Sequence, residues 1–332
     1  MTIKDLAERT GYGVATISRV LNGQPNVSEK ARKAILEAVE ESGFQINTNA
    51  KQLKAHATSI LVIVKGTANE MFSEMVETIQ SRVADTRYPL YVDYLDEDAN
   101  EVRRAVQLCR EKKPLGILFL GGNRQNFLQD FGKIDIPCVL VTNDASDLPF
   151  PKLSSVGTDD RQAARSAMDA LIAMGHRTFA IVGGDREKSE ISRLRYEGCM
   201  DSLRANGISF DETLGYRGVR FSCQAGYDAT RQMLAEGYPF TCLFAVADVM
   251  AIGAIRALYD GGLRVPQDVA VMGFDGLPLG SFLVPQLSTV IQSVREMALR
   301  SVELLMEQIE QGVEAKHEWV PFELCHREST KR

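Results

Sequence analysis

Two short amphipathic patterns open the chain, where residues 2–23 read TIKDLAERTGYGVATISRVLNG. Apolar side chains recur at helical spacing on both sides of a central GYG: Ile3, Leu6 and Ala7 before it, and Val14, Ile17, Val20 and Leu21 after it. Thr2 suits the N-cap of the first helix. Because a three-residue turn does not let the second helix continue in line with the first, the two helices must cross, and the stretch predicts a helix-turn-helix.

A third helix is expected at residues 28–43, which read SEKARKAILEAVEESG. Ser28 can cap its start and Gly43 can end it. Between them, one apolar stripe holds Ala31, Ala34, Ile35, Ala38 and Val39. The next segment, INTNAKQLKAHAT at residues 46–58, is polar and lacks a deep apolar face, which predicts a linker that is helical only in part.

From Ser59 onward, apolar strand-like runs alternate with helical patterns. The runs lie at residues 60–64, 117–120, 139–141, 179–182, 243–246 and 269–272, and helical patterns such as 71–83 and 161–174 separate them. Strands that are apolar on both faces and separated by helices indicate parallel sheets covered by helices. About 270 residues of this pattern are enough for two doubly wound halves.

The composition is that of a globular protein, with 45% hydrophobic and 25% charged residues in a chain of 332, a length that predicts two or more domains. The six cysteines show no close pairing, so we expect reduced thiols. The four histidines have no metal-ligand spacing, and we expect neither a metal nor a cofactor. Without a signal peptide or an apolar run long enough to span a bilayer, the sequence favours the cytoplasm.

The net charge of -6 is unevenly distributed along the chain. Residues 1–56 hold eight Lys or Arg against six Asp or Glu, so this segment carries +2 and the remainder carries -8. A mildly basic head on an acidic body fits a protein that offers only its head to a polyanion.

The second helix carries side chains suited to DNA rather than to a solvated surface. In a helix-turn-helix, the first turns of the second helix enter the major groove. There Arg19 can fork onto a guanine edge, Val14 and Ala15 can contact a thymine methyl, and the hydroxyls of Thr16 and Ser18 can bind phosphate. On spacing alone, a small helix packed within a helical subdomain stays an alternative.

The whole chain resembles the lactose-repressor (LacI/GalR) family of transcriptional regulators. The DNA-binding heads of that family carry ATVSRVLNG and VSEETR, which are similar to ATISRVLNG and VSEKAR here. The family's effector-binding core is similar to SVGTDDRQAARSAMDALIAMGHRTFAIVGG at residues 155–184, SRLRYEGCMDSLRANGI at 192–208 and FAVADVMAIGAIRALYDGGLRVPQDVAVMGFDGLPLGSFLVPQLSTV at 244–290. The resemblance implies an all-α helix-turn-helix head and an α/β core of two Rossmann-like, doubly wound lobes of the periplasmic-binding-protein type.

The resemblance also implies which residues contact DNA: Thr2, Val14, Ala15, Thr16, Ser18, Arg19, Asn22 and Asn26 of the head, and Lys51, Leu53 and Lys54 of the hinge. In the family, the linker becomes a hinge helix on the operator, and a leucine at the position of Leu53 inserts into the minor groove, where an apolar wedge kinks DNA. Packing of Leu53 against the core stays an alternative. Two departures weaken the pattern, since Ile46 replaces a usual proline and Gly13 a common serine cap.

In the core, the resemblance implies an effector site between the lobes, made by Met71, Phe72, Asn143, Arg195, Phe221, Ala247 and Asp275. Arg195 and Asp275 suit a polyol, because the Arg195 guanidinium supplies a fork of hydrogen-bond donors and the Asp275 carboxylate supplies acceptors. Phe221 offers a face on which a ring can lie. Ala247 stands where the family often has asparagine, so no particular sugar can be transferred from the family. Structural roles for Arg195, Phe221 and Asp275 stay open.

The expected organisation is therefore a head at residues 1–46, a hinge at 47–58, a first lobe at 59–158 and 292–320, and a second lobe at 159–291 and 321–332. We expect a homodimeric, bacterial cytoplasmic repressor, nucleoid-associated when DNA-bound, that binds palindromic operator DNA and a sugar or sugar derivative but no membrane. A purine or a phosphorylated carrier protein as effector stays open. A solute-binding protein would need export, and a nicotinamide enzyme would need the glycine fingerprint that VIVKGTANEMF lacks.

Overall fold

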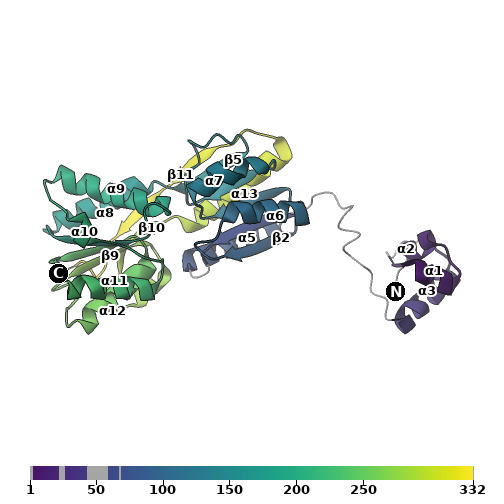
Figure 1. Cartoon of the computed structure of the whole chain (residues 1–332), viewed down its shortest axis with the longest axis horizontal. Coiled ribbons are helices and arrows are strands. Elements are labelled where there is room, and N and C mark those ends of the chain that lie inside the picture. Colours follow the sequence, from purple (N-terminus) through teal and green to yellow (C-terminus); the bar gives the residue numbers. More distant parts are fainter. Residues whose placement is uncertain (1–2, 22–26, 43–58, 67–68, 332) are drawn as a thin grey trace. The chain divides into compact units, whose positions relative to one another are not determined.

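The computed structural model describes residues 3–21, 27–42, 59–66 and 69–331, which belong to two units. Residues Met1–His56 include the head and Ala57–Arg332 the core (Figure 1). The described part of the head contains α1 (Ile3–Thr10), α2 (Val14–Leu21) and α3 (Glu29–Ser42). The expected hinge at residues 47–58 lies outside the described residues.

The turn between α1 and α2 spans residues 11–13 and confirms the helix-turn-helix. Gly11 ends α1 with a φ of +71°, a conformation that glycine adopts without strain, while its N–H donates to the carbonyl of Ala7. Ser28 caps α3, because its Oγ accepts the N–H of Ala31 at 3.4 Å.

A small apolar core holds the three head helices together. Its buried side chains are Leu6 from α1, Ile17 and Val20 from α2, and Ala31, Ile35 and Ala38 from α3. The expectation that Val14 belongs to this apolar face is wrong, because Val14 is 42% exposed. A residue in the first turn of α2 precedes the point at which this helix meets α1 and α3, so its side chain stays available.

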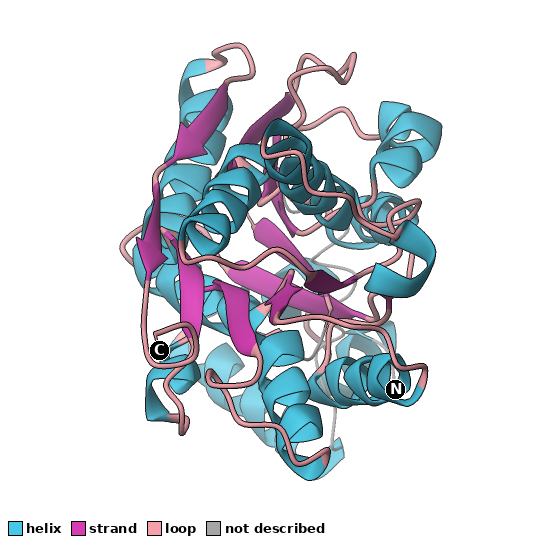
Figure 2. Ribbon diagram, turned by 90° about the vertical axis from the view of Figure 1, so that its left-hand side faces the viewer, coloured by secondary structure: helices cyan, strands magenta, loops and turns pink. Residues whose placement is uncertain are grey.

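The core contains two sheets, each of six strands in the described chain (Figure 2). We call the first sheet and its helices the first lobe. Its strands run in the order β11-β5-β4-β3-β1-β2 and all pair in parallel. Their bounds are β1 (Ile60–Lys65), β2 (Leu90–Leu95), β3 (Gly116–Leu120), β4 (Cys138–Val141), β5 (Leu153–Thr158) and β11 (His317–Val320). The covering helices are α5 (Glu70–Ala84), α6 (Glu101–Lys112), α7 (Arg124–Asp130), η1 (Phe131–Lys133) and α13 (Val294–Gln311).

The second sheet and its helices form the second lobe, with the strand order β12-β10-β9-β8-β6-β7. Its strands are β6 (Phe179–Gly183), β7 (Tyr216–Gly218), β8 (Cys242–Ala245), β9 (Ala270–Asp275), β10 (Ser288–Gln292) and β12 (Phe322–Cys325), of which β12 pairs antiparallel with β10. Its helices are α8 (Asp160–Ala173), α9 (Glu190–Ala205), α10 (Glu212–Gly215), α11 (Cys223–Ala235), α12 (Asp248–Asp260) and η2 (Pro278–Phe282).

The chain passes from one lobe to the other three times. It leaves the first lobe after β5, returns after β10 and leaves again between β11 and β12. Apolar strands mostly alternate with helices, as the sequence predicts, because a parallel strand needs a crossover connection, usually a helix, to return the chain to the same edge of the sheet; β4 and β5 are joined by a loop instead. The carboxyl ends of the parallel strands are therefore the edge at which loops and helix starts gather.

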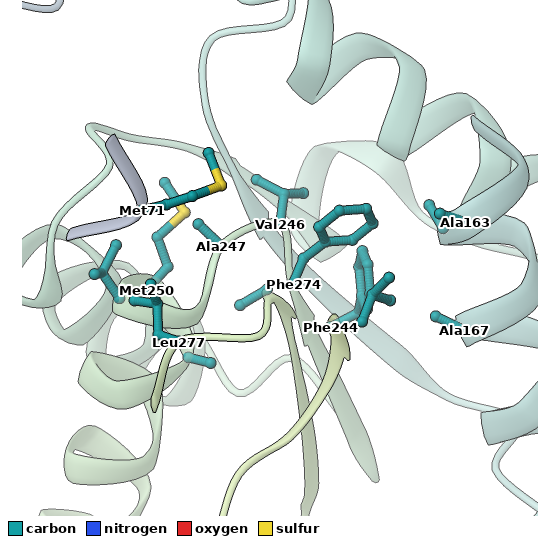
Figure 3. Close-up of a cluster of buried hydrophobic side chains, with 14 of the residues drawn as sticks. Met71, Ala163, Ala167, Phe244, Val246, Ala247, Met250, Phe274 and Leu277 are labelled. Atoms are coloured by element: carbon teal, nitrogen blue, oxygen red, sulfur yellow. The ribbon is translucent and has the colours of Figure 1, made fainter. Parts of the chain in front are cut away.

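Buried apolar side chains continue from one lobe into the other. Met71 from α5 of the first lobe belongs to the same buried cluster as Ala247, Met250 and Phe274 of the second (Figure 3).

The helices of the second lobe also approach very closely. A Cβ added to Gly198 of α9 would lie 2.1 Å from the carbonyl oxygen of Arg161 in α8, which only glycine avoids.

Candidate DNA-binding surface and effector cavity

Three described side chains of α2 among the predicted DNA contacts are at least partly accessible: Val14, Thr16 and Arg19. The N–H groups of Thr16 and Ile17 donate to the carbonyl of Gly13 at 2.8 and 3.1 Å and begin the helix. Arg19 is exposed and Thr16 is half-buried. With Val14, they present one cation, one hydroxyl and one small apolar group, which suit a base edge, a phosphate and a thymine methyl, respectively.

Several predicted DNA contacts lie outside what the structure describes. Thr2, Asn22, Asn26, Lys51, Leu53 and Lys54 fall outside the described residues. The side chains of Ala15 and Ser18 are likewise not described, although both residues lie within α2.

A cavity of 490 Å³ lies where loops of the two lobes meet at the carboxyl ends of their strands. The first lobe contributes residues that follow β1, β2, β3 and β4, and the second lobe contributes residues that follow β6 and β7. Four of the lining residues are helix N-caps: Asn69 of α5, Asn123 of α7, Ser189 of α9 and Ser222 of α11. Such a volume is suitable for a small organic molecule.

Three of the predicted effector residues line this cavity: Phe72 and Asn143 from the first lobe and Phe221 from the second. The Phe72 ring packs against Gly121, where an added Cβ would lie 3.1 Å from its Cζ. Asn143 is 4% exposed, and its Oδ1 accepts the hydroxyl of Thr142 at 3.3 Å. The other predicted effector residues, Met71, Arg195, Ala247 and Asp275, do not line the cavity and are all buried.

Arg195 and Asp275 belong to a buried polar network in the second lobe. The Arg195 guanidinium donates through Nε to Asp160 Oδ1 at 2.7 Å, and its Nη1 lies 3.4 Å from Asp275 Oδ1 and donates to the carbonyl of Val246. Its Cζ lies 3.5 Å from the centroid of the Phe274 ring. The donor and the acceptor predicted for a ligand therefore pair with each other in this structure.

This network extends to the segments that join the lobes. Gln292, at the end of β10, donates through Nε2 to Asp275 Oδ1 at 2.9 Å and lies 3.4 Å from the sulfur of Met71. Its Oε1 accepts the hydroxyl of Thr158, the last residue of β5, at 2.9 Å. Two of the three crossings thus share one glutamine, so a movement of the lobes would disturb the surroundings of Asp275.

Two carboxyl groups in this region have strongly perturbed pKa values. Burial raises the pKa of Asp275 to about 6, against the opposing effect of the Arg195 charge. Burial, followed by the nearby charge of Asp275, raises the pKa of Asp248 to about 8. Asp248 accepts the Thr289 hydroxyl and the N–H of Leu277, both at 2.7 Å.

Ala247 precedes α12 with extended backbone but supplies no side-chain cap. An asparagine at this N-cap could accept a helix N–H, a contact worth about 0.5–2 kcal/mol that alanine cannot make. The departure from the family pattern therefore removes both a cap and a polar group from this part of the second lobe.

Sequence reasoning missed most of the polar groups of the cavity wall. They include Lys65, Asp96, Glu97, Asp98, Asn123, Lys188 and Arg220. The available signal was positional, because asparagine and serine N-caps after parallel strands mark the edge at which ligands bind. The ion pairs of Arg220 join residues about 120 positions apart in the sequence, so no local pattern announces them.

In the described residues, no group of three or more His, Cys, Asp or Glu side chains could hold a metal ion. None of the described helices is long and apolar enough to cross a membrane. Within the same residues, none of the six cysteines forms a disulfide bond.

A helical DNA-binding head followed by a two-lobed core with a cavity between the lobes defines a class of ligand-responsive DNA-binding proteins. Models of known families match both parts: bacterial regulatory proteins of the lacI family at residues 2–47, and the periplasmic binding protein-like domain at residues 168–330. The HTH-type transcriptional regulator MalR of Clostridium butyricum is 34% identical over 335 residues, covering 99% of each chain. The chain therefore belongs to the lacI family and is a DNA-binding transcriptional regulator.

Other relatives agree with this assignment. Catabolite control protein A of Priestia megaterium is 29% identical over 334 residues, covering 100% of this chain and 99% of that protein. The Lac repressor dimer bound to operator and the anti-inducer ONPF has a TM-score of 0.73 at 27% identity, covering 99% of each chain. A CelR–cellobiose complex has a TM-score of 0.71 at 25% identity with the same coverage. These relatives are regulators and not enzymes.

Proposed function

We propose that this regulator is a repressor that binds a palindromic operator as a homodimer and is controlled by a small carbohydrate-like effector. The effector binds between the lobes, in the cavity at the carboxyl ends of the two sheets. The observation that carries the proposal is this cavity, lined by amide and hydroxyl groups beside the rings of Phe72 and Phe221. The similarity to a CelR–cellobiose complex supports it.

On the DNA side, we propose that α2 lies in the major groove and that two heads of a dimer reach two half-sites. Val14, Ala15, Thr16, Ser18 and Arg19 supply its contacts. The remaining contacts come from Thr2 near the start of the chain, from Asn22 and Asn26 between α2 and α3 in the sequence, and from a hinge in which Leu53 acts as the wedge between Lys51 and Lys54. The exposure of Val14 and Arg19 supports this assignment.

On the effector side, Phe72, Asn143 and Phe221 contact the ligand directly. The buried residues Met71, Arg195 and Asp275 respond to the ligand through the network around Gln292, and Ala247 follows Val246, whose carbonyl accepts a hydrogen bond from Arg195. We propose that residues 59–158 and 292–320 form one lobe and that residues 159–291 and 321–332 form the other. The lobes then move relative to each other about the three crossings. A ligand can shift the equilibrium between two lobe arrangements only by binding one of them more tightly.

The test starts by selecting an operator from a pool of random DNA with the full-length chain. A thermal-shift screen then presents sugars, nucleobases and a phosphorylated carrier protein to the same protein. Each ligand that raises the melting temperature is added to an operator titration followed by fluorescence anisotropy. A sugar that changes operator affinity supports the proposal, whereas a response only to nucleobases or only to the carrier protein would replace the carbohydrate by that effector.

A further inference from the structure

The charged groups of the cavity wall define which kind of sugar the cavity accepts. Of the described residues on the wall, three are basic and four are acidic: Lys65, Lys188 and Arg220 against Asp96, Glu97, Asp98 and Asp185. Residues 67 and 68, which the structure does not describe, are threonine and alanine and add no charge. The wall therefore carries more negative than positive charge.

Arg220 is neutralised by three consecutive carboxylates from the other lobe. Its Nη2 lies 2.8 Å from Asp96, its Nε 2.8 Å from Glu97 and its Nη1 3.0 Å from Asp98. These acids follow β2 of the first lobe, whereas Arg220 follows β7 of the second. The Asp98 N–H and the Arg220 charge lower the pKa of Asp96, which keeps this carboxylate ionised. One cation thus faces three anions, and two negative charges remain.

The two lysines also have acidic partners. Lys65 Nζ lies 2.5 Å from Glu101, a fully buried carboxylate that also accepts the N–H of Asn123. Lys188 Nζ lies 3.6 Å from Asp185. Lys65 and Arg220 are therefore held by carboxylates, whereas Lys188 is 70% exposed and its pair with Asp185 is weak. A phosphate group entering this cavity would still face more carboxylates than cations on the described wall.

Helix starts around the cavity favour a ligand that is rich in oxygen. The N-termini of α5, α9 and α11 carry partial positive charge, which attracts anions. Here a side-chain oxygen already caps each of these helices, and α5 and α9 have an acidic residue in the first turn. The helix ends thus suit the partial charge of hydroxyl oxygens, while the surrounding carboxylates oppose a full negative charge.

Three side-chain amides of the wall still have donors available to a ligand. Asn69, Asn123 and Asn143 line the cavity and use their Oδ1 atoms as acceptors within the protein. Their amide nitrogens donate to no described residue. Amide donors and carboxylate acceptors together match a hydroxyl group, which both accepts and donates.

From these contacts we infer that the cavity selects an uncharged polyhydroxy compound, such as an unphosphorylated sugar, and that Asp96, Glu97 and Asp98 are specificity determinants that reject its phosphorylated form. This inference rests on the proposed function and narrows its effector class. The three carboxylates act by like-charge repulsion, a mechanism that discriminates against one ligand without requiring a better contact to the other.

The test measures ligand binding to the full-length protein by titration calorimetry with matched pairs: cellobiose and cellobiose 6-phosphate, ribose and ribose 5-phosphate, glucose and glucose 6-phosphate. For any pair that binds the wild type, we expect the neutral sugar to bind more tightly than its phosphorylated form by a factor on the order of 100. In Asp96→Asn/Glu97→Gln/Asp98→Asn, Arg220 loses its carboxylate partners, and the preference should fall by a factor of at least about 10.

Two further variants make the test decisive. Asp135→Asn removes an exposed carboxylate of the same lobe that is paired with Lys152 and lies outside the cavity, and it should keep the wild-type preference. If the triple variant fails to fold, the single variant Glu97→Gln is measured instead. Its preference for the neutral ligand should be lower than that of the wild type by a factor of about three or more.

Binding of a phosphorylated sugar by the wild type as tightly as its neutral partner would overturn the inference and leave the carbohydrate effector standing. An unchanged preference in the folded carboxylate variants would overturn the role of these residues. If neither member of any pair binds, the proposed carbohydrate effector fails and the inference fails with it.

Discussion

Replacing Arg195 by alanine should destabilise the core far more than replacing an exposed arginine that makes equally short ion pairs. Arg195 is 3% exposed and lies between Asp160 and Asp275, which are 3% and 5% exposed. After the change, Asp275 still accepts a hydrogen bond from Gln292, whereas Asp160 loses the hydrogen bond that it accepts from Arg195. Both carboxyl groups would then stay buried beside an empty space.

The magnitude follows from this burial. Removing one partner of a buried ion pair costs about 3–5 kcal/mol, because an uncompensated charge remains. Loss of the contact between the guanidinium and the Phe274 ring adds roughly 0.5–2 kcal/mol. Protonation of the two carboxyl groups limits the total cost, so we expect Arg195→Ala to lower the free energy of unfolding by about 3–5 kcal/mol at pH 8. The decrease should be smaller at pH 5, because protons on the carboxyl groups then replace the missing positive charge.

The control is Arg264→Ala. Arg264 contacts Asp268 at 2.8 Å, but its side chain is 71% exposed, so the expected loss is about 0–1 kcal/mol. Urea unfolding followed by circular dichroism at both pH values measures the free energy of unfolding of the two variants. Equal losses for the two variants, or a loss for Arg195→Ala that does not change with pH, would refute the reasoning.

Three other changes test the head, the buried carboxyl groups and the helix packing. Arg19→Ala should weaken binding to the selected operator by about 1–3 kcal/mol and binding to random DNA by less, measured by anisotropy; equal losses would make Arg19 a phosphate contact only. Burial raises the pKa of Asp248 from its ordinary value of about 4 to about 8, so this group should lower the stability of the wild type as the pH rises from about 4 to about 8. Asp248→Asn should remove this contribution and leave that of Asp275, whose pKa is also raised, and parallel stability–pH curves for the two proteins would contradict it. Gly198→Ala should cost about 1–3 kcal/mol or more of unfolding free energy, because the added Cβ would lie 2.1 Å from the Arg161 carbonyl oxygen. Gly132→Ala, with no atom within 4 Å of the added Cβ, is the control, and equal melting temperatures would be inconsistent with tight helix contact.

The fold could be predicted because its signals are local. Each apolar run at residues 60–64 or 179–182 forms a buried parallel strand, since such strands have helices on both faces and no polar side to display. The helix-turn-helix follows from the spacing of Leu6, Ile17 and Val20 around a three-residue turn. Val14 shows the limit of this reasoning, because apolar character and helical spacing do not distinguish a core residue from one that is available to a partner.

The composition of the cavity could be predicted only in part, and that part came from the resemblance to the family. Three of the residues that the resemblance implied lie on the wall: Phe72, Asn143 and Phe221. The electrostatic character of the wall instead depends on which charges cancel, and this is decided by contacts across the two lobes. Lys65 and Arg220 each look like an anion-binding residue in the sequence, yet both are neutralised in the structure by carboxylates more than thirty positions away.

The same cancellation explains why Arg195 and Asp275 could be identified as important without their role being fixed. A fork of donors and a carboxylate suit a polyol, but they suit each other equally well, and the structure pairs them at 3.4 Å. Because Gln292 links Asp275 to the crossing after β10 and to Thr158 at the crossing after β5, any ligand that draws Asp275 away must also change the contacts between two crossings. A residue such as Asp275, which forms hydrogen bonds and an ion pair within the protein, can therefore couple ligand binding to the arrangement of the lobes. A residue that contacts only the ligand has no such coupling.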